Sequence, residues 1–145
     1  MDLPLISRIL LYIILILFGL LCILIFGWQI NVLRGKPMNN PDGTVDDWHE
    51  QKLFYGIAVA DITIAVPVAL IGIALIFIGL RIGYYLTGLA SFWFLWTNTM
   101  TTVTSLRFEK PKITLMWFIV FPLGAIIGLA YIVWTLVHFE AIISA

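Results

Sequence analysis

Long runs of apolar residues, separated by short polar segments, make up most of this sequence. Four runs reach the roughly 20 residues that an α-helix needs to cross a hydrocarbon core of about 30 Å. They cover residues 5–33, 53–80, 84–106 and 113–139. Because the runs are apolar nearly all round, they are typical of membrane-spanning helices and not of a soluble helical core. The pattern predicts an all-α, four-helix transmembrane bundle that forms a single integral membrane domain, residues 1–145.

The connections between the runs set the predicted topology. A polar loop, residues 34–52, follows the first run, and the other two connections are short. Short connections place consecutive helices side by side in opposite directions, which predicts an antiparallel up-down bundle. Within the polar loop, the sequence Asn-Pro-Asp-Gly predicts a tight turn and an ordered hairpin. Thr44 and Asp47 resemble a capping box that would start the second helix near Val45.

Charge gives this bundle an orientation. Eight basic and eight acidic residues leave no net charge, so the balance does not suggest nucleic acid as a partner. Most basic residues lie in the connections 34–52 and 107–112. The positive-inside rule therefore predicts that these two loops are cytoplasmic and that both termini lie on the opposite side. Tryptophans at the loop boundary predict an interfacial aromatic belt: Trp28, Trp48 and Trp117.

One carboxylate, Asp61, interrupts the second apolar run and is the main functional candidate. An Asp near the middle of a membrane costs roughly 2.5–3.5 kcal/mol, so it is expected to face the bundle interior or a cavity. Helical spacing places it on a stripe of small residues that allow another helix to approach closely. The stripe comprises Ala58, Asp61, Ala65, Ala69 and Gly72. Asp61 is therefore predicted to point into an interface between helices.

Polar residues on the neighbouring runs predict what Asp61 faces. A rise of about 1.5 Å per residue puts Asn98 at a depth similar to that of Asp61. Pro67 leaves the carbonyl of Thr63 without its helical donor. The predicted pocket for an ion, a lipid or a small solute comprises Asp61, Thr97, Asn98, Thr101, Gln29, Asn31 and Thr63. The alternative is a purely structural cluster in which a protonated Asp61 is bonded to Asn98.

Other residues offer further chemistry. Helical spacing can place acids and a histidine of the polar loop on one face as metal ligands, although a helix dipole alone also favours such acids. These residues are Asp46, His49 and Glu50. Gly124 and Gly128 form a GxxxG motif for close helix crossing, within the bundle or between subunits. The aromatic residues of 92–96 are expected to pack against neighbours and lipid.

These observations favour one interpretation of function and leave two alternatives. We expect a small polytopic membrane protein, a non-catalytic subunit or homo-oligomer, with an intramembrane polar pocket. The first alternative is a small oligomeric transporter or channel that uses Asp61 as its coupling carboxylate. The second is a membrane-embedded enzyme or redox subunit that handles lipid or quinone. The sequence holds no catalytic motif and identifies no cofactor. Expected partners are the lipid bilayer and a second copy or another membrane subunit.

Overall fold

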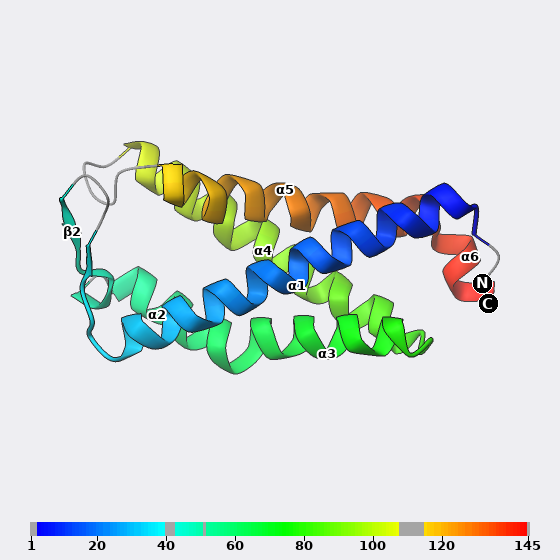
Figure 1. Cartoon of the computed structure of the whole chain (residues 1–145), viewed down its shortest axis with the longest axis horizontal. Coiled ribbons are helices and arrows are strands. Elements are labelled where there is room, and N and C mark those ends of the chain that lie inside the picture. The colour runs from blue at the N-terminus through cyan, green and yellow to red at the C-terminus, as the bar shows by residue number, and fades with distance from the viewer. Residues whose placement is uncertain (1–2, 40–42, 51, 108–114, 145) are drawn as a thin grey trace.

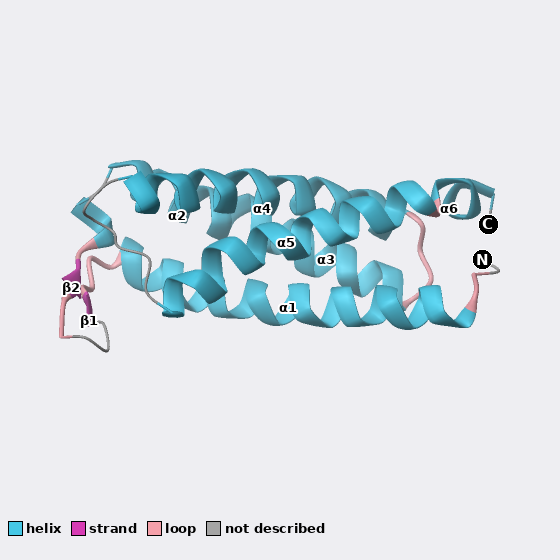
Figure 2. Ribbon diagram, turned by 90° about the horizontal axis from the view of Figure 1, so that it is seen from above, coloured by secondary structure: helices cyan, strands magenta, loops and turns pink. Residues whose placement is uncertain are grey.

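Most of the chain is helical in the computed structural model, which describes residues 3–39, 43–50, 52–107 and 115–144. In this described part, four long helical segments lie side by side along the long axis of the molecule (Figures 1 and 2). They are α1 (Leu5–Leu33), the segment formed by α2 and α3, α4 (Ile82–Arg107) and α5 (Leu115–Val137). The short helix α6 (Phe139–Ser144) lies near the N-terminus (Figure 1).

The second helical segment changes its winding at Asp61. The helix α2 (Lys52–Ala60) passes into a π-helical turn, η2 (Asp61–Ala65), and then into α3 (Val66–Phe77). Val66 donates its backbone N–H to the carbonyl oxygen of Asp61, which is the i to i+5 bond of a π-helix. Pro67 has no N–H to donate, so the regular hydrogen-bond ladder is interrupted here. Such turns occur frequently at functional sites.

A Schellman motif ends α3. Gly79 adopts a φ of +81°, which a residue without a Cβ tolerates. It donates its N–H to the carbonyl of Ile76, and Leu80 donates to the carbonyl of Leu75. The helix therefore ends at Phe77, three residues before the predicted end of the second run. The predicted bounds of the first run agree with those of α1, residues 5–33.

A small hairpin, not a helix, connects α1 to the next segment. The strand β1 (Met38–Asn39) pairs antiparallel with β2 (Val45–Asp46), and a 3-10 turn, η1 (Trp48–Glu50), follows. The predicted hairpin is therefore confirmed. The predicted helix start near Val45 was wrong, because Val45 lies opposite Asn39 in the ladder. The tip of the predicted turn, residues 40–42, lies outside the described residues.

Three of the described helical segments are long and apolar enough to cross a membrane: Leu5–Leu33, Lys52–Phe77 and Trp117–Val137. The helix α4 has 26 residues but is not among them. It packs along both α3 and α5, and α1 also contacts these two helices. The least apolar of the long helices thus lies against two apolar ones.

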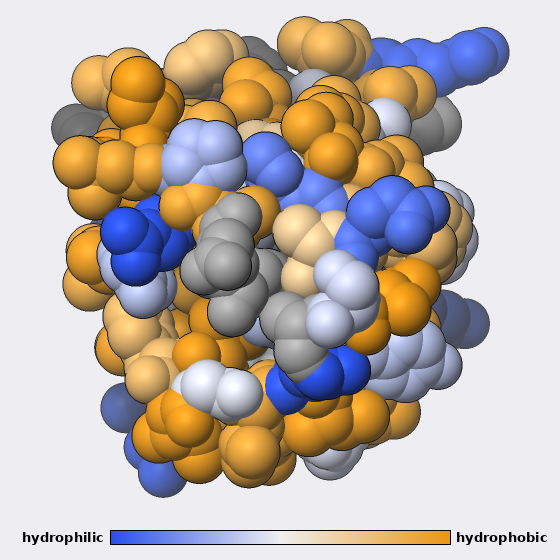
Figure 3. Space-filling view, turned by 90° about the vertical axis from the view of Figure 1, so that its right-hand side faces the viewer, coloured by the Kyte–Doolittle hydropathy of each residue, from blue (hydrophilic) through white to orange (hydrophobic). Residues whose placement is uncertain are grey.

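Much of the outer surface is apolar. Large apolar side chains are exposed along all four long segments, for example Leu24, Ile71, Leu89 and Ile126. Figure 3 views the end at which the termini lie and shows apolar side chains in orange over most of that face, with hydrophilic ones scattered among them. Extended exposed apolar surface marks a contact with membrane or protein.

Two apolar clusters fill the interior, one at the hairpin end and a larger one toward the termini. On α1, Gln29 lies between Val32 of the first cluster and Ile25 of the second. Asp61 occupies the same place in its own segment, between Ala58 and Ala65. The boundary between the two clusters is therefore a polar layer.

Candidate functional site

The side chain of Asp61 is buried in this polar layer, with 6% of its surface exposed. Gln29 of α1 donates its Nε2 to Oδ2 of Asp61 at 2.7 Å. Trp93 of α4 donates its indole Nε1 to Oδ1 at 2.8 Å. Each carboxylate oxygen thus accepts one hydrogen bond from an uncharged donor. The stripe of small residues that predicted this orientation is buried throughout, so the prediction that Asp61 points between helices is confirmed.

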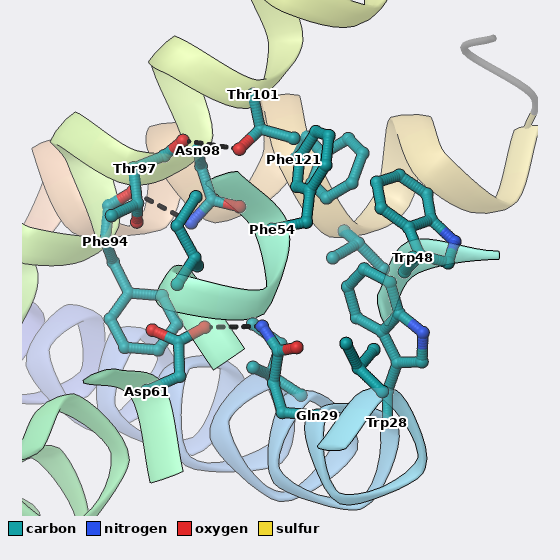
Figure 4. Close-up of a pocket in the computed structure, with 14 residues that line it drawn as sticks. Trp28, Gln29, Trp48, Phe54, Asp61, Phe94, Thr97, Asn98, Thr101 and Phe121 are labelled. Atoms are coloured by element: carbon teal, nitrogen blue, oxygen red, sulfur yellow. Dashed lines mark hydrogen bonds between the residues drawn. The ribbon is translucent and has the colours of Figure 1, made fainter. Parts of the chain in front are cut away.

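A small cavity adjoins Asp61 (Figure 4). The space open to the centre of a water molecule amounts to about 20 Å³. By this measure one water needs roughly 10–15 Å³, so the cavity admits one water-sized guest. Of the described residues that line it, only Asp61 has an ionisable side chain. Five residues of the predicted pocket line this cavity: Gln29, Asp61, Thr97, Asn98 and Thr101.

The polar side chains of α4 that line the cavity donate to carbonyls of their own helix. Thr97 donates its Oγ1 hydrogen to the carbonyl of Trp93, and Thr101 donates to the carbonyl of Thr97, each at 2.8 Å. Asn98 donates its Nδ2 to the carbonyl of Phe94, also at 2.8 Å. Because these hydrogens are committed, the hydroxyl oxygens keep only acceptor capacity toward a guest.

The two amides of the site are oriented by partners that can only accept. A carbonyl and a carboxylate have no hydrogen to offer, so each must face an amide nitrogen. The nitrogen of Asn98 faces Phe94 and that of Gln29 faces Asp61. The amide oxygens Oδ1 of Asn98 and Oε1 of Gln29 therefore remain for a guest. Together with the carboxylate, they make the polar side of the cavity rich in acceptor oxygens.

Aromatic rings form the wall of the cavity toward the hairpin. Trp48 packs edge to face on Trp28 and on Phe54, with ring centroids 5.2 and 4.5 Å apart. In Figure 4 the indole nitrogens of Trp28 and Trp48 lie on the side of the rings away from Asp61. The π-systems of these rings attract cations. Trp48 and Trp117, predicted for the interfacial belt, are each 1% exposed and pack inside this cluster.

Asp46 holds the hairpin onto the helices. It is 8% exposed, and Trp117 of α5 donates its Nε1 to Oδ2 of Asp46 at 3.2 Å. Among the described residues, no group of three His, Cys, Asp or Glu side chains could hold a metal ion. The predicted metal set includes His49, whose side chain lies outside the described residues, so this set stays a prediction.

Two predicted pocket residues lie outside the cavity. Asn31 is exposed near the end of α1. Thr63 is also exposed and donates to the carbonyl of its own helix at Val59. Trp93 was expected only to pack, yet it is a direct partner of the carboxylate. The sequence did offer a sign of this role. Trp93 lies four residues before Thr97, and residues four apart share a helix face, so Trp93 lies on the same face as the predicted pocket residues.

The GxxxG motif of α5 serves packing against α4 within the chain. A Cβ atom placed on Gly124 would lie 3.0 Å from the side-chain amide of Asn98. A Cβ atom on Gly128 would lie 2.6 Å from the carbonyl oxygen of Ser91. Gly124 therefore makes room for the amide that faces the cavity. The alternative prediction paired Asn98 with Asp61. In the structure, Asn98 donates to the carbonyl of Phe94, and Asp61 accepts from Trp93.

Comparisons of this chain with models of protein families, with curated proteins and with solved structures give no match.

Proposed function

We propose that this chain is a non-catalytic integral membrane protein with four antiparallel spanning helices that binds one small monovalent cation at Asp61. The helix α4 serves as the fourth span: its 26 residues extend about 39 Å, longer than a hydrocarbon core. Most of its polar residues do not oppose this, because six of them are buried against other helices: Thr87, Ser91, Thr97, Asn98, Thr101 and Ser105. The positive-inside rule then puts the loops 34–52 and 107–112 in the cytoplasm.

The observation that carries the cation assignment is the set of acceptor oxygens around one buried carboxylate. The hydroxyl hydrogens of Thr97 and Thr101 and one amide hydrogen each of Gln29 and Asn98 are committed to other acceptors. Each amide keeps one further N–H, so the acceptor oxygens of these four side chains and the carboxylate outnumber the remaining donors. Hard cations prefer oxygen ligands of this kind, and the nearby rings add further attraction for positive charge.

The size of the cavity selects among the guests that the sequence allowed. Ligand pockets for drug-sized molecules measure roughly 300–1,000 Å³, whereas this cavity offers about 20 Å³. A lipid headgroup or a quinone is therefore too large. A single ion that has shed most of its water fits.

The charge of the site favours a monovalent ion. Asp61 is the one residue with an ionisable side chain among the described residues that line the cavity. Placing an unpaired charge in the middle of a membrane costs roughly 2.5–3.5 kcal/mol on insertion scales. A monovalent cation neutralises the carboxylate, whereas a divalent cation leaves an excess positive charge in the same apolar surroundings.

Thermal unfolding of the purified protein tests this proposal. A sodium, potassium or lithium chloride series is compared with choline chloride at equal ionic strength, so that only specific binding raises the melting temperature. An ion at one hundred times its Kd stabilises by about 2.7 kcal/mol, which corresponds to a rise of about 5–10 °C for a chain of this size. We expect this rise for the native protein and for the Glu140→Gln control, an exposed acid in α6, and none for Asp61→Asn. Equal melting temperatures in all four salts would contradict the proposal.

A further inference from the structure

The helix α4 carries polar residues along its buried face well beyond the cation site. Thr87 and Ser91 lie on one side of Trp93, the partner of Asp61, and Thr101 and Ser105 lie on the other. From Thr87 to Ser105 the stripe is about 27 Å long, close to the thickness of a hydrocarbon core. Packing against apolar helices does not require a polar face of this length.

Three hydroxyls of the stripe have no hydrogen-bond partner among the described residues: those of Thr87, Ser91 and Ser105. All three side chains are buried, Thr87 and Ser91 completely. The threonines of the cavity satisfy their hydroxyls with the carbonyl four residues earlier. Buried polar groups without partners are rare and call for an explanation. A passing ion or water would supply such a partner.

Close backbone packing shuts the stripe on the side of the termini. A Cβ atom on Gly128 would meet the carbonyl oxygen of Ser91 at 2.6 Å. A Cβ atom on Gly72 would meet Oγ1 of Thr87 at 2.5 Å and its backbone nitrogen at 2.7 Å. The cavity at Asp61 lies on the hairpin side of these contacts. The structure thus corresponds to a state in which the site is closed toward the termini.

We propose that the buried stripe of α4 is a route by which the cation leaves the Asp61 site toward the termini, so that the protein transports the ion across the membrane. This inference rests on the proposed function. The π-helical turn η2 lies between α2 and α3, where the regular ladder is interrupted. A change of winding at this turn would shift α3, which carries Gly72, away from Thr87 while α2 stays in place.

Uptake of sodium-22 into proteoliposomes tests the route, with binding of the same ion to the detergent-purified protein measured in parallel. We expect the native protein to bind and to take up the ion. Ser91→Ala should bind within twofold of the native protein but take up the ion about tenfold more slowly, because one partner along the route is lost. Thr99→Ala, which removes an exposed hydroxyl of α4, should leave both values unchanged.

The outcomes separate this inference from the proposed function. Binding without uptake by the native protein would overturn the transport inference and leave the cation site intact. Failure to bind would overturn the proposed function and the inference together. Uptake by Ser91→Ala at the native rate would overturn the route along α4. If Ser91→Ala does not fold, Thr87→Val, which keeps the side-chain shape and removes the hydroxyl, gives the same comparison.

Discussion

Replacing Trp93 with Phe removes one of the two donors to Asp61 while keeping an aromatic ring in place. The indole N–H lies 2.8 Å from Oδ1 in a partly buried environment. A hydrogen bond to a charged group contributes about 1.5–3 kcal/mol. In choline chloride, we therefore expect Trp93→Phe to lower the free energy of unfolding by this amount, which is about 3–12 °C in melting temperature.

The cation should then restore part of the loss. In Trp93→Phe, Oδ1 of Asp61 no longer accepts a hydrogen bond from the indole. Its negative charge is then less compensated, so it attracts a bound cation more strongly. We expect sodium to bind about tenfold tighter, a gain of about 1.4 kcal/mol. The rise in melting temperature caused by saturating sodium should accordingly exceed that of the native protein by about 3–6 °C.

Trp96→Phe is the matched control, because Trp96 lies on the same helix, is 52% exposed and contacts the ring of Trp93. Its unfolding free energy should change by about 0.5 kcal/mol or less. Differential scanning fluorimetry of the three proteins in choline and sodium chloride gives all the values needed. A smaller sodium response in Trp93→Phe than in the native protein would refute the reasoning that the indole and the cation share the same carboxylate.

Three further predictions concern the surroundings of the site. Gly128→Ala should destabilise the protein by about 1–3 kcal/mol through overpacking. A Cβ atom on Gly88 would have no neighbouring atom within 4 Å, so Gly88→Ala should stabilise α4 by about 0.5–1 kcal/mol. Thermal melts compare the two variants. Asp46→Ala leaves the indole of Trp117 without the partner described above and should increase proteolysis of the hairpin several-fold, with sodium binding retained. Thr63→Val changes an exposed hydroxyl and should leave sodium affinity within twofold of the native value.

Apolar run length was sufficient to predict the four long helical segments, and three of them are long and apolar enough to cross a membrane. The stripe of small residues likewise oriented Asp61, since an acid is tolerated in an apolar segment only where another helix covers it. The end of α3 was missed by three residues because Gly79 closes the helix through backbone bonds. A run of apolar residues does not reveal such a cap.

The partner of Asp61 could not be predicted from depth alone. A rise per residue gives the level of each side chain but not its direction or reach, and Asn98 uses its amide nitrogen within α4. Gln29, a residue of the predicted pocket, and Trp93, which was expected only to pack, supply the bonds instead. The strand at Val45 was also missed. The same residue types favour helix caps and turns, so the sequence alone does not separate a helix start from a hairpin. The pairing of Val45 with Asn39 shows that this segment is a strand.

Anomalous diffraction from crystals grown in thallium(I), a heavy monovalent cation, tests the central claim most directly. We predict an anomalous peak inside the cavity, within coordination distance of the carboxylate of Asp61 and of the amide oxygen of Asn98, and no such peak in Asp61→Asn. A native cavity that stays free of thallium while thallium binds elsewhere on the same molecule would contradict the account.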